Sequence, residues 1–580
     1  MELDPDLFRR LKDLPRSSTA PELQKATENA QPRAEVRDRP NIVVILADDL
    51  GFSDLGCYGG EIDTPVLDRL AAGGLRFTQF YNTARCCPTR ASLLTGLYPH
   101  QAGIGEMTGE TRPSDGTKDP KDYGHPGYRG RLTSRCVTIA EVLRRGGYDT
   151  MMTGKWHVGY LDPRSWPRRR GFDRYYGVLE GAANYFQPNH PRYRRPFALD
   201  DKLIAEFEPD YYTTDVFTDY AIRFMTESQS RGDKPFFAYI AYNAPHWPLH
   251  ARPDDIARYR DKYRIGWDEV RRRRYRRQQE MGIAGPGWAL SSRGEGIESP
   301  TWRNYGGGPV PAWDSLSEAQ QDEMDLRMAI YAAMVDRLDQ NVGRIVDYLE
   351  QSGQLDNTLI LFLSDNGGAL GGGPLGFNRR DDVPAERWGG ANSFISYGTG
   401  WANASNTPFR KLKCFTHEGG IATPLIAHWP EGIAGQGRIS RDVGHVIDVM
   451  ATCVDLARCQ YPQYHNGMEI LPLEGKSLAP VFRGRQRDGH RAIFWEHTGN
   501  RAVRAGRWKL VSEYTQPWEL YNLDADRAEL NNLAAEMPDK VRQLEAMYED
   551  YARRCEVQPW AQVDAVRQAQ AIRRAQSAKE

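Results

Sequence analysis

Two adjacent cysteines, Cys86 and Cys87, are followed directly by Pro88, Thr89 and Arg90. Proline is favoured in the first turn of a helix, where its missing N–H group has no hydrogen bond to lose. The sequence therefore predicts that Cys86 lies at a helix N-terminus, where free N–H groups and the helix dipole stabilise negative charge. Arg90, one turn later, brings a positive charge to the same place. Such a position can activate a thiolate nucleophile or bind an oxyanion.

Polar side chains that could do chemistry also follow four apolar runs elsewhere in the chain. Each run is short, is rich in β-branched or aromatic residues, and is typical of a strand buried on both faces of a parallel sheet. The residues that follow these runs are Asp48 and Asp49, Lys155 and His157, His246, and Asp365 and Asn366. Because ligands bind beyond the carboxyl ends of strands in open α/β sheets, we expect these side chains to form one polar site.

The acidic residues among them suit a metal ion. Asp48, Asp49, Asp365 and Asn366 offer oxygen ligands only. Hard oxygen donors without histidine or thiolate favour Ca²⁺ or Mg²⁺ over zinc. An Asp-Asp pair after one strand is often a turn or a helix cap, but a second acidic strand end makes a metal site the stronger interpretation.

The elements that must position these residues are predicted by the pattern of the whole chain. Helical patterns lie between the apolar runs, for example over 138–147 and 316–351. Strands that alternate with helices predict an α/β fold with a large, mostly parallel central sheet flanked by helices. A basic run at 269–280 is interpreted as a solvated helix face.

The pattern changes after about residue 435. Short apolar segments between 491 and 522 predict a small antiparallel sheet, and a helix with Pro538 in its first turn follows over 537–554. These elements predict a smaller C-terminal α+β subdomain. We therefore divide the chain into a lead-in (1–39), a catalytic domain (40–435), the C-terminal subdomain (436–555) and a tail (556–580).

The composition argues against several classes of protein. The 580 residues carry a formal net charge of −1, which gives no overall attraction to nucleic acid or to an anionic membrane. No apolar run is long enough to cross a membrane, and the N-terminal segment lacks the apolar region of a secretory signal. Eight cysteines without zinc-site or dense disulfide spacing favour a cytoplasmic location; a periplasmic one is the alternative if a signal was removed.

The motif C-x-P-x-R, followed by L-L-T-G at 93–96, resembles the signature of the formylglycine-dependent type I sulfatases, which have an alkaline-phosphatase-like fold. Four further segments resemble the same family. They are G-Y-D-T-M-M-T-G-K-W-H (147–157), N-A-P-H-W-P (243–248), S-D-N-G-G (364–368) and N-T-P-F-R-K-L-K-C-F-T-H-E-G-G (406–420). Together these segments span about residues 40–430.

The resemblance implies that Cys86 is oxidised to 3-oxoalanine (Cα-formylglycine) by a formylglycine-generating enzyme. It also implies one bound Ca²⁺, in preference to Mg²⁺, held by residue 86 with Asp48, Asp49, Asp365 and Asn366. The implied reaction is hydrolysis of a small-molecule aryl or alkyl sulfate ester to a phenol or alcohol and inorganic sulfate. In that mechanism the formylglycine hydrate attacks sulfur, and a sulfated hemiacetal then releases sulfate.

The resemblance also implies roles for the cationic residues. Arg90 holds the formylglycine hydrate, and Lys155 bridges the hydrate and a sulfate oxygen. Lys413 and His246 contact the sulfate or the leaving oxygen, with His246 as the proton donor. His157 acts as the general base in hemiacetal breakdown.

Three alternatives use the same residues differently. A phosphonate monoester or phosphodiester hydrolase shares the formylglycine machinery, but such relatives carry histidine where this chain has Asn366. A non-catalytic binder of sulfated ligands would leave Cys86 as a thiol. A redox-active pair at Cys86 and Cys87 would oxidise reversibly without a metal, although adjacent cysteines lack the C-x-x-C spacing.

Overall fold

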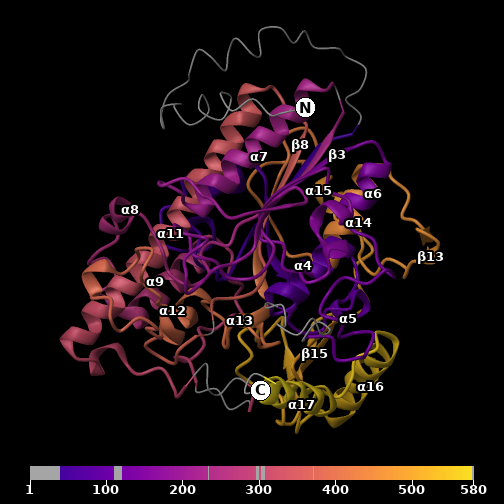
Figure 1. Cartoon of the computed structure of the whole chain (residues 1–580). Coiled ribbons are helices and arrows are strands. Elements are labelled where there is room, and N and C mark those ends of the chain that lie inside the picture. Colours follow the sequence, from indigo (N-terminus) through magenta and orange to yellow (C-terminus); the bar gives the residue numbers. More distant parts are fainter. Residues whose placement is uncertain are drawn as a thin grey trace.

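A large sheet of 11 strands runs through the centre of the computed structural model, which describes residues 39–109, 121–232, 234–295, 300–301, 307–369 and 371–577 (Figure 1). The strand order is β10-β2-β9-β8-β1-β7-β3-β4-β5-β6, and β11 also pairs with β2. The strands are β1 (Asn41–Ala47), β2 (Leu75–Tyr81), β3 (Asp149–Gly154), β4 (Arg174–Val178), β5 (Phe197–Leu199), β6 (Lys202–Ile204), β7 (Phe236–Ala241), β8 (Thr358–Ser364), β9 (Ala422–His428), β10 (Arg438–Ser440) and β11 (Gly444–His445).

Five neighbouring strands at the centre of this sheet, β8, β1, β7, β3 and β4, are parallel to one another. Antiparallel pairs lie toward the edges, where β9 joins β8 to β2 and where β5 joins β4 to β6. The predicted mostly parallel sheet is therefore confirmed. Because the central strands are parallel, their carboxyl ends lie side by side at the same end of the strands.

Helices cover both faces of the sheet. They are α3 (Pro65–Gly73), α4 (Cys86–Thr95), α5 (Pro99–Ala102), α6 (Ile139–Arg145), α7 (Thr213–Ser230), α8 (Pro253–Ala257), α9 (Gly266–Glu280), α11 (Glu318–Gln351), α12 (Gly398–Ser405), α13 (Glu418–Ile421), α14 (Ile447–Leu456), α15 (Ala479–Phe482), α16 (Pro538–Arg554) and α17 (Trp560–Ser577). Ser317 and Gln320 form a capping box at the start of the long α11. None of the described helices is long and apolar enough to cross a membrane.

Alternate residues of β1 face opposite sides of the sheet, as expected for a strand buried on both faces. Val43 and Ile45 pack in a core cluster that includes residues of α3, α7 and α11. Ile42, Val44 and Leu46 pack in a second cluster with residues of α4, α6 and α14. Figure 1 shows α7 and α11 on one side of the sheet and α6 and α14 on the other. Two apolar layers thus hold the central strands in place.

The smaller C-terminal sheet is also confirmed. It is antiparallel in the order β14 (Ile493–His497), β15 (Asn500–Ala505), β16 (Trp508–Ser512) and β17 (Glu519–Asn522). Leu544 and Tyr548 of α16 pack against Val503 and Leu510 of this sheet. A separate hairpin pairs β12 (Tyr464–His465) with β13 (Met468–Glu469).

Most of the predicted lead-in, 1–38, lies outside the described residues. The predicted tail contains helix α17, whose Trp560 and Val563 pack against Tyr123 and Tyr128. Strands β10 and β11 of the large sheet follow residue 435 in the chain, and the division proposed at that residue stays a prediction.

The interpretation of 269–280 as a solvated helix face is wrong for two of its arginines. Arg272 and Arg273 of α9 are 60% and 58% exposed and pair with Glu269 on the same helix. Arg271 and Arg274 are buried instead. Charge pattern within a helix shows where cations occur, but burial depends on which carboxylates the fold brings to them from elsewhere.

Candidate active site

Cys86 is the first residue of helix α4, as the Cys-Cys-Pro sequence predicts. Arg85 precedes it in an extended conformation, and the Thr89 N–H group donates to the Arg85 carbonyl at 2.9 Å. The whole helix is buried, and Cys86 itself is only 2% exposed. Residue 86 therefore lies in the protein interior at the positive end of a helix dipole.

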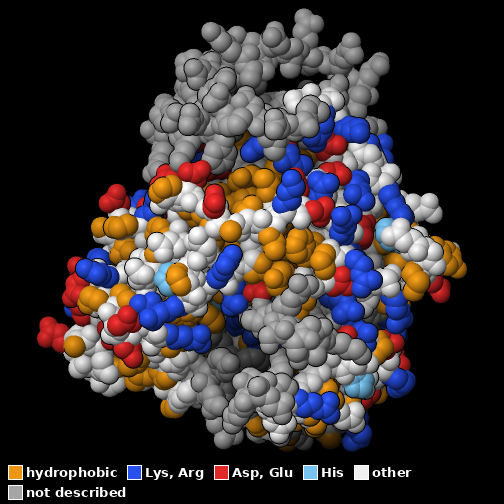
Figure 2. Space-filling view, in the orientation of Figure 1, with side chains coloured by type: hydrophobic (Ala, Val, Ile, Leu, Met, Phe, Trp, Pro, Cys, Tyr) orange, Lys and Arg blue, Asp and Glu red, His pale blue; other side chains and the backbone are white. Residues whose placement is uncertain are grey.

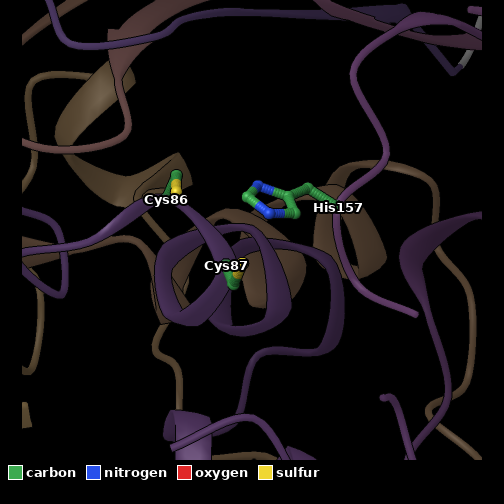
Figure 3. Close-up of side chains that lie close together, drawn as sticks. All are labelled: Cys86, Cys87 and His157. Carbon is green, nitrogen blue, oxygen red and sulfur yellow. The ribbon is translucent and has the colours of Figure 1, made fainter. Parts of the chain in front are cut away.

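The two cysteines are not equivalent (Figure 3). His157, in the loop after β3, lies beside the first turn of α4, and the Cys86, Cys87 and His157 ligand atoms are all within 4.8 Å of one another. The Cys87 sulfur also lies 3.6 Å from the Met107 sulfur and 3.7 Å from the Thr108 hydroxyl. Cys87 thus belongs to the packing around the helix, as expected for the variable position of the motif.

Arg90 connects helix α4 to the ends of two strands. Its Nε and Nη2 groups donate to Oδ2 of Asp365 at 3.1 and 2.8 Å, and Nη1 donates to the Lys155 carbonyl at 2.9 Å. A second carboxylate, Oδ1 of Asp48, lies 3.8 Å from Nη2. Arg90 is completely buried, so these contacts fix its guanidinium in one orientation.

The two remaining cations each meet a carboxylate that follows β1. Lys155 donates to Oδ2 of Asp48 at 2.6 Å, and both side chains are fully buried. Lys413, from the loop before α13, donates to Oδ1 of Asp49. The same Asp49 oxygen accepts a 2.7 Å hydrogen bond from Nδ2 of Asn366. Three carboxylates and three permanent cations therefore meet at the carboxyl ends of the central strands.

His246 approaches this group from the loop after β7. Its Nδ1 atom lies 2.5 Å from the Trp247 carbonyl, and its Nε2 atom lies 3.4 Å from Oδ2 of Asp49. The carbonyl can only accept, so Nδ1 carries a proton and Nε2 faces the charged cluster. Tyr185 supports the loop by donating to the Asn243 and His246 carbonyls. Burial lowers the pKa of His246, although Asp49 favours its protonated form.

Charges around residue 86 favour an anion there. A hydrogen bond from Cys87 holds the pKa of the Cys86 thiol well below its usual range, and Lys155, His157 and Lys413 act in the same direction against the opposing effect of burial. The site therefore stabilises the negatively charged form of the group at residue 86.

The acids of the cluster are shifted in opposite directions. Burial would raise the pKa of Asp48, but Lys155, His246 and Arg90 outweigh it and hold the pKa below its usual range. Burial and the neighbouring charge of Asp48 raise the pKa of Asp365 well above its usual range. A divalent cation stabilises buried acidic groups that would otherwise repel one another.

Three buried oxygens in this cluster fit a hard metal ion. Asp48 Oδ1, Asp49 Oδ2 and Asn366 Oδ1 accept no hydrogen bond from the described part of the chain. Buried polar atoms nearly always have a partner, and carboxylate and amide oxygens are the ligands that Ca²⁺ and Mg²⁺ prefer. Asp365 contributes a carboxylate whose Oδ1 atom accepts from the Asp49 N–H group at 3.3 Å. These residues could hold the predicted ion.

Unusual backbone conformations gather at the site. Asp49, Ala84, His157 and Cys414 have φ values of 69°, 66°, 56° and 80°. Non-glycine residues rarely adopt positive φ, and those that do are concentrated at functional sites, where surrounding contacts hold them. Asp49 follows β1, His157 follows β3, Ala84 precedes α4, and Cys414 is next to Lys413. The strain therefore coincides with the segments that orient the predicted functional residues.

A buried network holds the loop that carries Lys413. Glu418 begins α13 and lies 2.9 Å from Lys509 of β16, and Lys509 lies 2.7 Å from Glu529. Arg527 lies 2.9 Å from the other Glu418 oxygen. These partners of Glu418 were not among the residues predicted from the sequence. The only signal in the sequence is a set of charged residues inside otherwise apolar C-terminal segments.

The turn between β14 and β15 also reaches the site. Asn500 donates to the Cys414 carbonyl at 2.9 Å, and Arg85 donates to the Cys414 sulfur at 3.0 Å. His497, at the end of β14, is fully buried, and the charges of Arg85 and Cys86 both affect its pKa, which burial holds well below its usual range. The C-terminal sheet thus contributes to the surroundings of residue 86. Its signal in the sequence is the polar string E-H-T-G-N between two predicted strands.

The structure brings all the predicted site residues into this one region. They come from the ends of β1, β3 and β8, from the loop after β7, from α4 and from the loop before α13; they are Asp48, Asp49, Cys86, Arg90, Lys155, His157, His246, Asp365, Asn366 and Lys413. Their individual catalytic and metal-binding roles stay predictions.

Known proteins share this sequence and architecture. Residues 40–459 match the Sulfatase family, and residues 411–553 match the family described as N-sulphoglucosamine sulphohydrolase, C-terminal. The chain is 34% identical over 539 residues to an uncharacterized sulfatase of Schizosaccharomyces pombe, covering 87% of this chain and 92% of that protein. It is 32% identical over 465 residues to an arylsulfatase of Klebsiella aerogenes, covering 77% and 93%.

A solved structure agrees with these relatives. The crystal structure of Ps i-CgsB in complex with k-i-k-neocarrahexaose superimposes with a TM-score of 0.62 and 26% identity, covering 89% of this chain and 93% of that one. The family match and these relatives, together with the α/β sheet, identify a type I sulfatase of the alkaline-phosphatase-like superfamily. The chain belongs to the sulfatase family and is a sulfuric ester hydrolase.

Proposed function

We propose that the protein hydrolyses aryl or alkyl sulfate monoesters, using a formylglycine formed from Cys86 and one bound Ca²⁺. The observation that carries this proposal is the position of Cys86, at the N-terminus of α4 and beside Lys155, His157 and Lys413. The 32% identity to a protein named arylsulfatase supports an aryl or alkyl leaving group.

Two groups beyond the unmodified chain would supply part of the chemistry. Conversion of Cys86 to formylglycine would supply an aldehyde whose hydrate offers one hydroxyl for attack on sulfur and another for the release of sulfate. Ca²⁺ bound by residue 86, Asp48, Asp49, Asp365 and Asn366 would supply a Lewis acid that polarises oxygen. The unpartnered oxygens in this set support the choice of ligands.

The chain's own cations bind and orient the sulfate group. Arg90, held by Asp365, is fixed beside residue 86 and orients its side chain. Lys155 donates to Asp48 and Lys413 donates to Asp49, so each carboxylate of the pair holds one lysine in the site. The three carboxylates and three cations of the cluster balance in charge. A bound divalent cation would make the site positive, and a positive site attracts a sulfate monoester. Fixed cations around the reacting group stabilise the charge that develops in the transition state.

The two histidines move protons. His157 lies next to residue 86 and takes a proton from it when sulfate is released. His246 keeps one proton on Nδ1 through the Trp247 carbonyl, so its imidazolium form, which Asp49 favours, carries the second proton on Nε2 and delivers it to the leaving oxygen. Burial of His246 within the cluster excludes bulk water from this transfer.

Maturation requires a formylglycine-generating enzyme as a partner. Cys86, Pro88 and Arg90 are all buried in the folded chain, so a modifying enzyme has access to the motif only before the domain has folded. We therefore propose that modification precedes folding, and that it takes place in the cytoplasm, the proposed location of the protein.

The test combines a mass measurement with turnover. The residue-86 peptide of the purified protein is analysed by mass spectrometry, and hydrolysis of 4-nitrophenyl sulfate and an alkyl sulfate is followed for wild type, Cys86→Ala and the matched control Cys87→Ala. We expect formylglycine at residue 86, no turnover by Cys86→Ala and turnover by Cys87→Ala. Turnover by protein whose Cys86 is still a thiol would contradict the proposal.

A further inference from the structure

An aromatic group adjoins His246, the proposed proton donor. The Trp247 ring packs against the His246 ring with a centroid distance of 4.6 Å. Phe377 and Phe394 then pack on Trp247 at 5.3 and 5.9 Å. We call Trp247, Phe377 and Phe394 the aromatic wall. It begins at His246, the proposed proton donor to the leaving oxygen; Trp247 and Phe377 are partly exposed, and Phe394 is buried.

A cation is fixed over the aromatic wall. The Arg379 guanidinium lies 4.6 Å from the Phe377 ring centroid, 5.2 Å from Phe394 and 5.4 Å from Trp247. Each distance is within the range of a cation–π interaction. Arg379 is exposed, and no ion pair links it to a carboxylate within the described residues. The neighbouring Arg380, in contrast, is paired with Asp382 at 2.7 Å.

The backbone explains why these side chains share a face. Asn378 and Ile395 form an antiparallel bridge, the Arg379 N–H group donates to the Phe394 carbonyl, and the Ser396 N–H group donates to the Phe377 carbonyl. Residues that are paired or two apart in such a ladder point to the same side.

This ladder is fixed to the main helix layer. Arg327 of α11 donates to the Phe377 carbonyl at 2.9 Å and also donates to the Ser396 carbonyl. Arg379 is therefore an oriented cation that lies over the three rings of the aromatic wall, and the Trp247 part of that wall adjoins His246. Lys and Arg side chains, with Asp and Glu among them, are spread over the described part of the face in Figure 2.

We propose that Trp247, Phe377, Phe394 and Arg379 form the leaving-group subsite, and that it selects aryl sulfates carrying a second anionic group on the ring. This inference rests on the proposed function and specifies its substrate class. The arene lies along the aromatic wall while its sulfate is in the cluster, and its ring carboxylate or second sulfate pairs with Arg379. Rigid aromatic surfaces with one placed polar group are typical of sites that orient small ligands.

The test compares two nearly isosteric substrates, 4-carboxyphenyl sulfate and 4-carbamoylphenyl sulfate, which differ by one negative charge. We expect wild type to show kcat/KM about fivefold higher for the carboxylate, the effect of a unit charge pair about 4 Å apart in water. Arg379→Gln should remove this preference, and Arg379→Lys should retain part of it. Arg380→Gln, which removes the adjacent paired cation, should leave the preference unchanged.

The apolar part of the subsite is tested separately. Phe377→Leu should lower kcat/KM for 4-nitrophenyl sulfate about two- to tenfold, the effect of an aromatic pair, and should lower kcat/KM for hexyl sulfate by a smaller factor.

Four outcomes would overturn the inference. If both ring substrates are hydrolysed with equal kcat/KM, or if Arg379→Gln keeps the carboxylate preference, the subsite assignment fails while the proposed sulfatase reaction stands. Faster turnover of galactose 6-sulfate than of either aryl sulfate would mean that the subsite binds a sugar and not an arene. If none of these sulfate esters is hydrolysed, the proposed function fails and the inference fails with it.

Discussion

Replacing Lys509 with methionine should destabilise the protein by about 3–5 kcal/mol, the usual effect of breaking a buried ion pair from one side. Lys509 lies between Glu418 and Glu529, and all three side chains are fully buried. Methionine is similar in length but carries no charge, so two buried carboxylates would lose their shared cation. Arg527 would still pair with Glu418, which keeps the expected effect within this range.

The pKa of Glu418 gives a second measure of how strongly this ion-pair network contributes to stability. Burial would raise this pKa, but Lys509, Arg527 and Arg504 lower it from 4.5 to about 2. One pKa unit corresponds to about 1.4 kcal/mol, so the network favours ionised Glu418 by about 3 kcal/mol. Because the folded pKa is depressed, this contribution is present above about pH 4.5 and is lost as the pH falls toward 2.

The assay is urea unfolding at pH 7, followed by tryptophan fluorescence. Lys476→Met is the matched control, because its partner Asp488 is 99% exposed and such pairs contribute at most about 1 kcal/mol. The double variant Lys509→Met with Glu418→Gln should be less destabilised than the two single variants added together. A loss for Lys509→Met no larger than that of Lys476→Met would refute the reasoning.

The remaining predictions concern another buried cation, a buried histidine and the metal. Arg274→Met should lower the free energy of unfolding by about 3–5 kcal/mol, since Arg274 pairs with Asp54 and Glu61 at 2.7 Å; an equal loss for the exposed Arg273→Met would contradict this. Burial lowers the pKa of His250 from 6.5 to about 4, so stability should fall by about 3 kcal/mol as the pH drops from 6.5 to 4. In His250→Gln the urea midpoint should change less between pH 6.5 and 4 than in wild type. An equal change in both proteins would contradict this prediction. Treatment with EGTA should abolish turnover of 4-nitrophenyl sulfate and Ca²⁺ should restore it, while full activity in EGTA would exclude a required calcium ion.

The core of the site was predictable because it depends on local sequence and on one property of parallel sheets. Asp48, Lys155 and Asp365 each follow a buried apolar run, and the carboxyl ends of parallel strands meet at one edge. Cys86 was placed by Pro88, whose preference for the first turn of a helix does not depend on distant contacts. The resemblance to a family then added Lys413, which follows no strand of the sheet.

The supporting contacts were not predictable, because they join residues far apart in the chain. Arg274 lies 220 residues from Asp54 in the sequence, and nothing in the basic run of α9 indicates that partner. The same is true of Lys509 and Glu418, which are 91 residues apart. The turn that places Asn500 against the Cys414 carbonyl depends on how the C-terminal sheet docks. Such contacts follow from tertiary packing, which alternating or helical patterns do not encode.

The most direct test of the central claim compares 4-nitrophenyl sulfate with a matched aryl phosphonate monoester. The protein is a calcium-loaded preparation whose residue-86 peptide carries formylglycine, so that failed maturation does not affect the comparison. Asn366, at the position where the formylglycine-dependent phosphonate hydrolases carry histidine, predicts a clearly higher kcat/KM for the sulfate ester. A higher kcat/KM for the phosphonate would contradict the account, and would assign the same machinery to phosphonate hydrolysis.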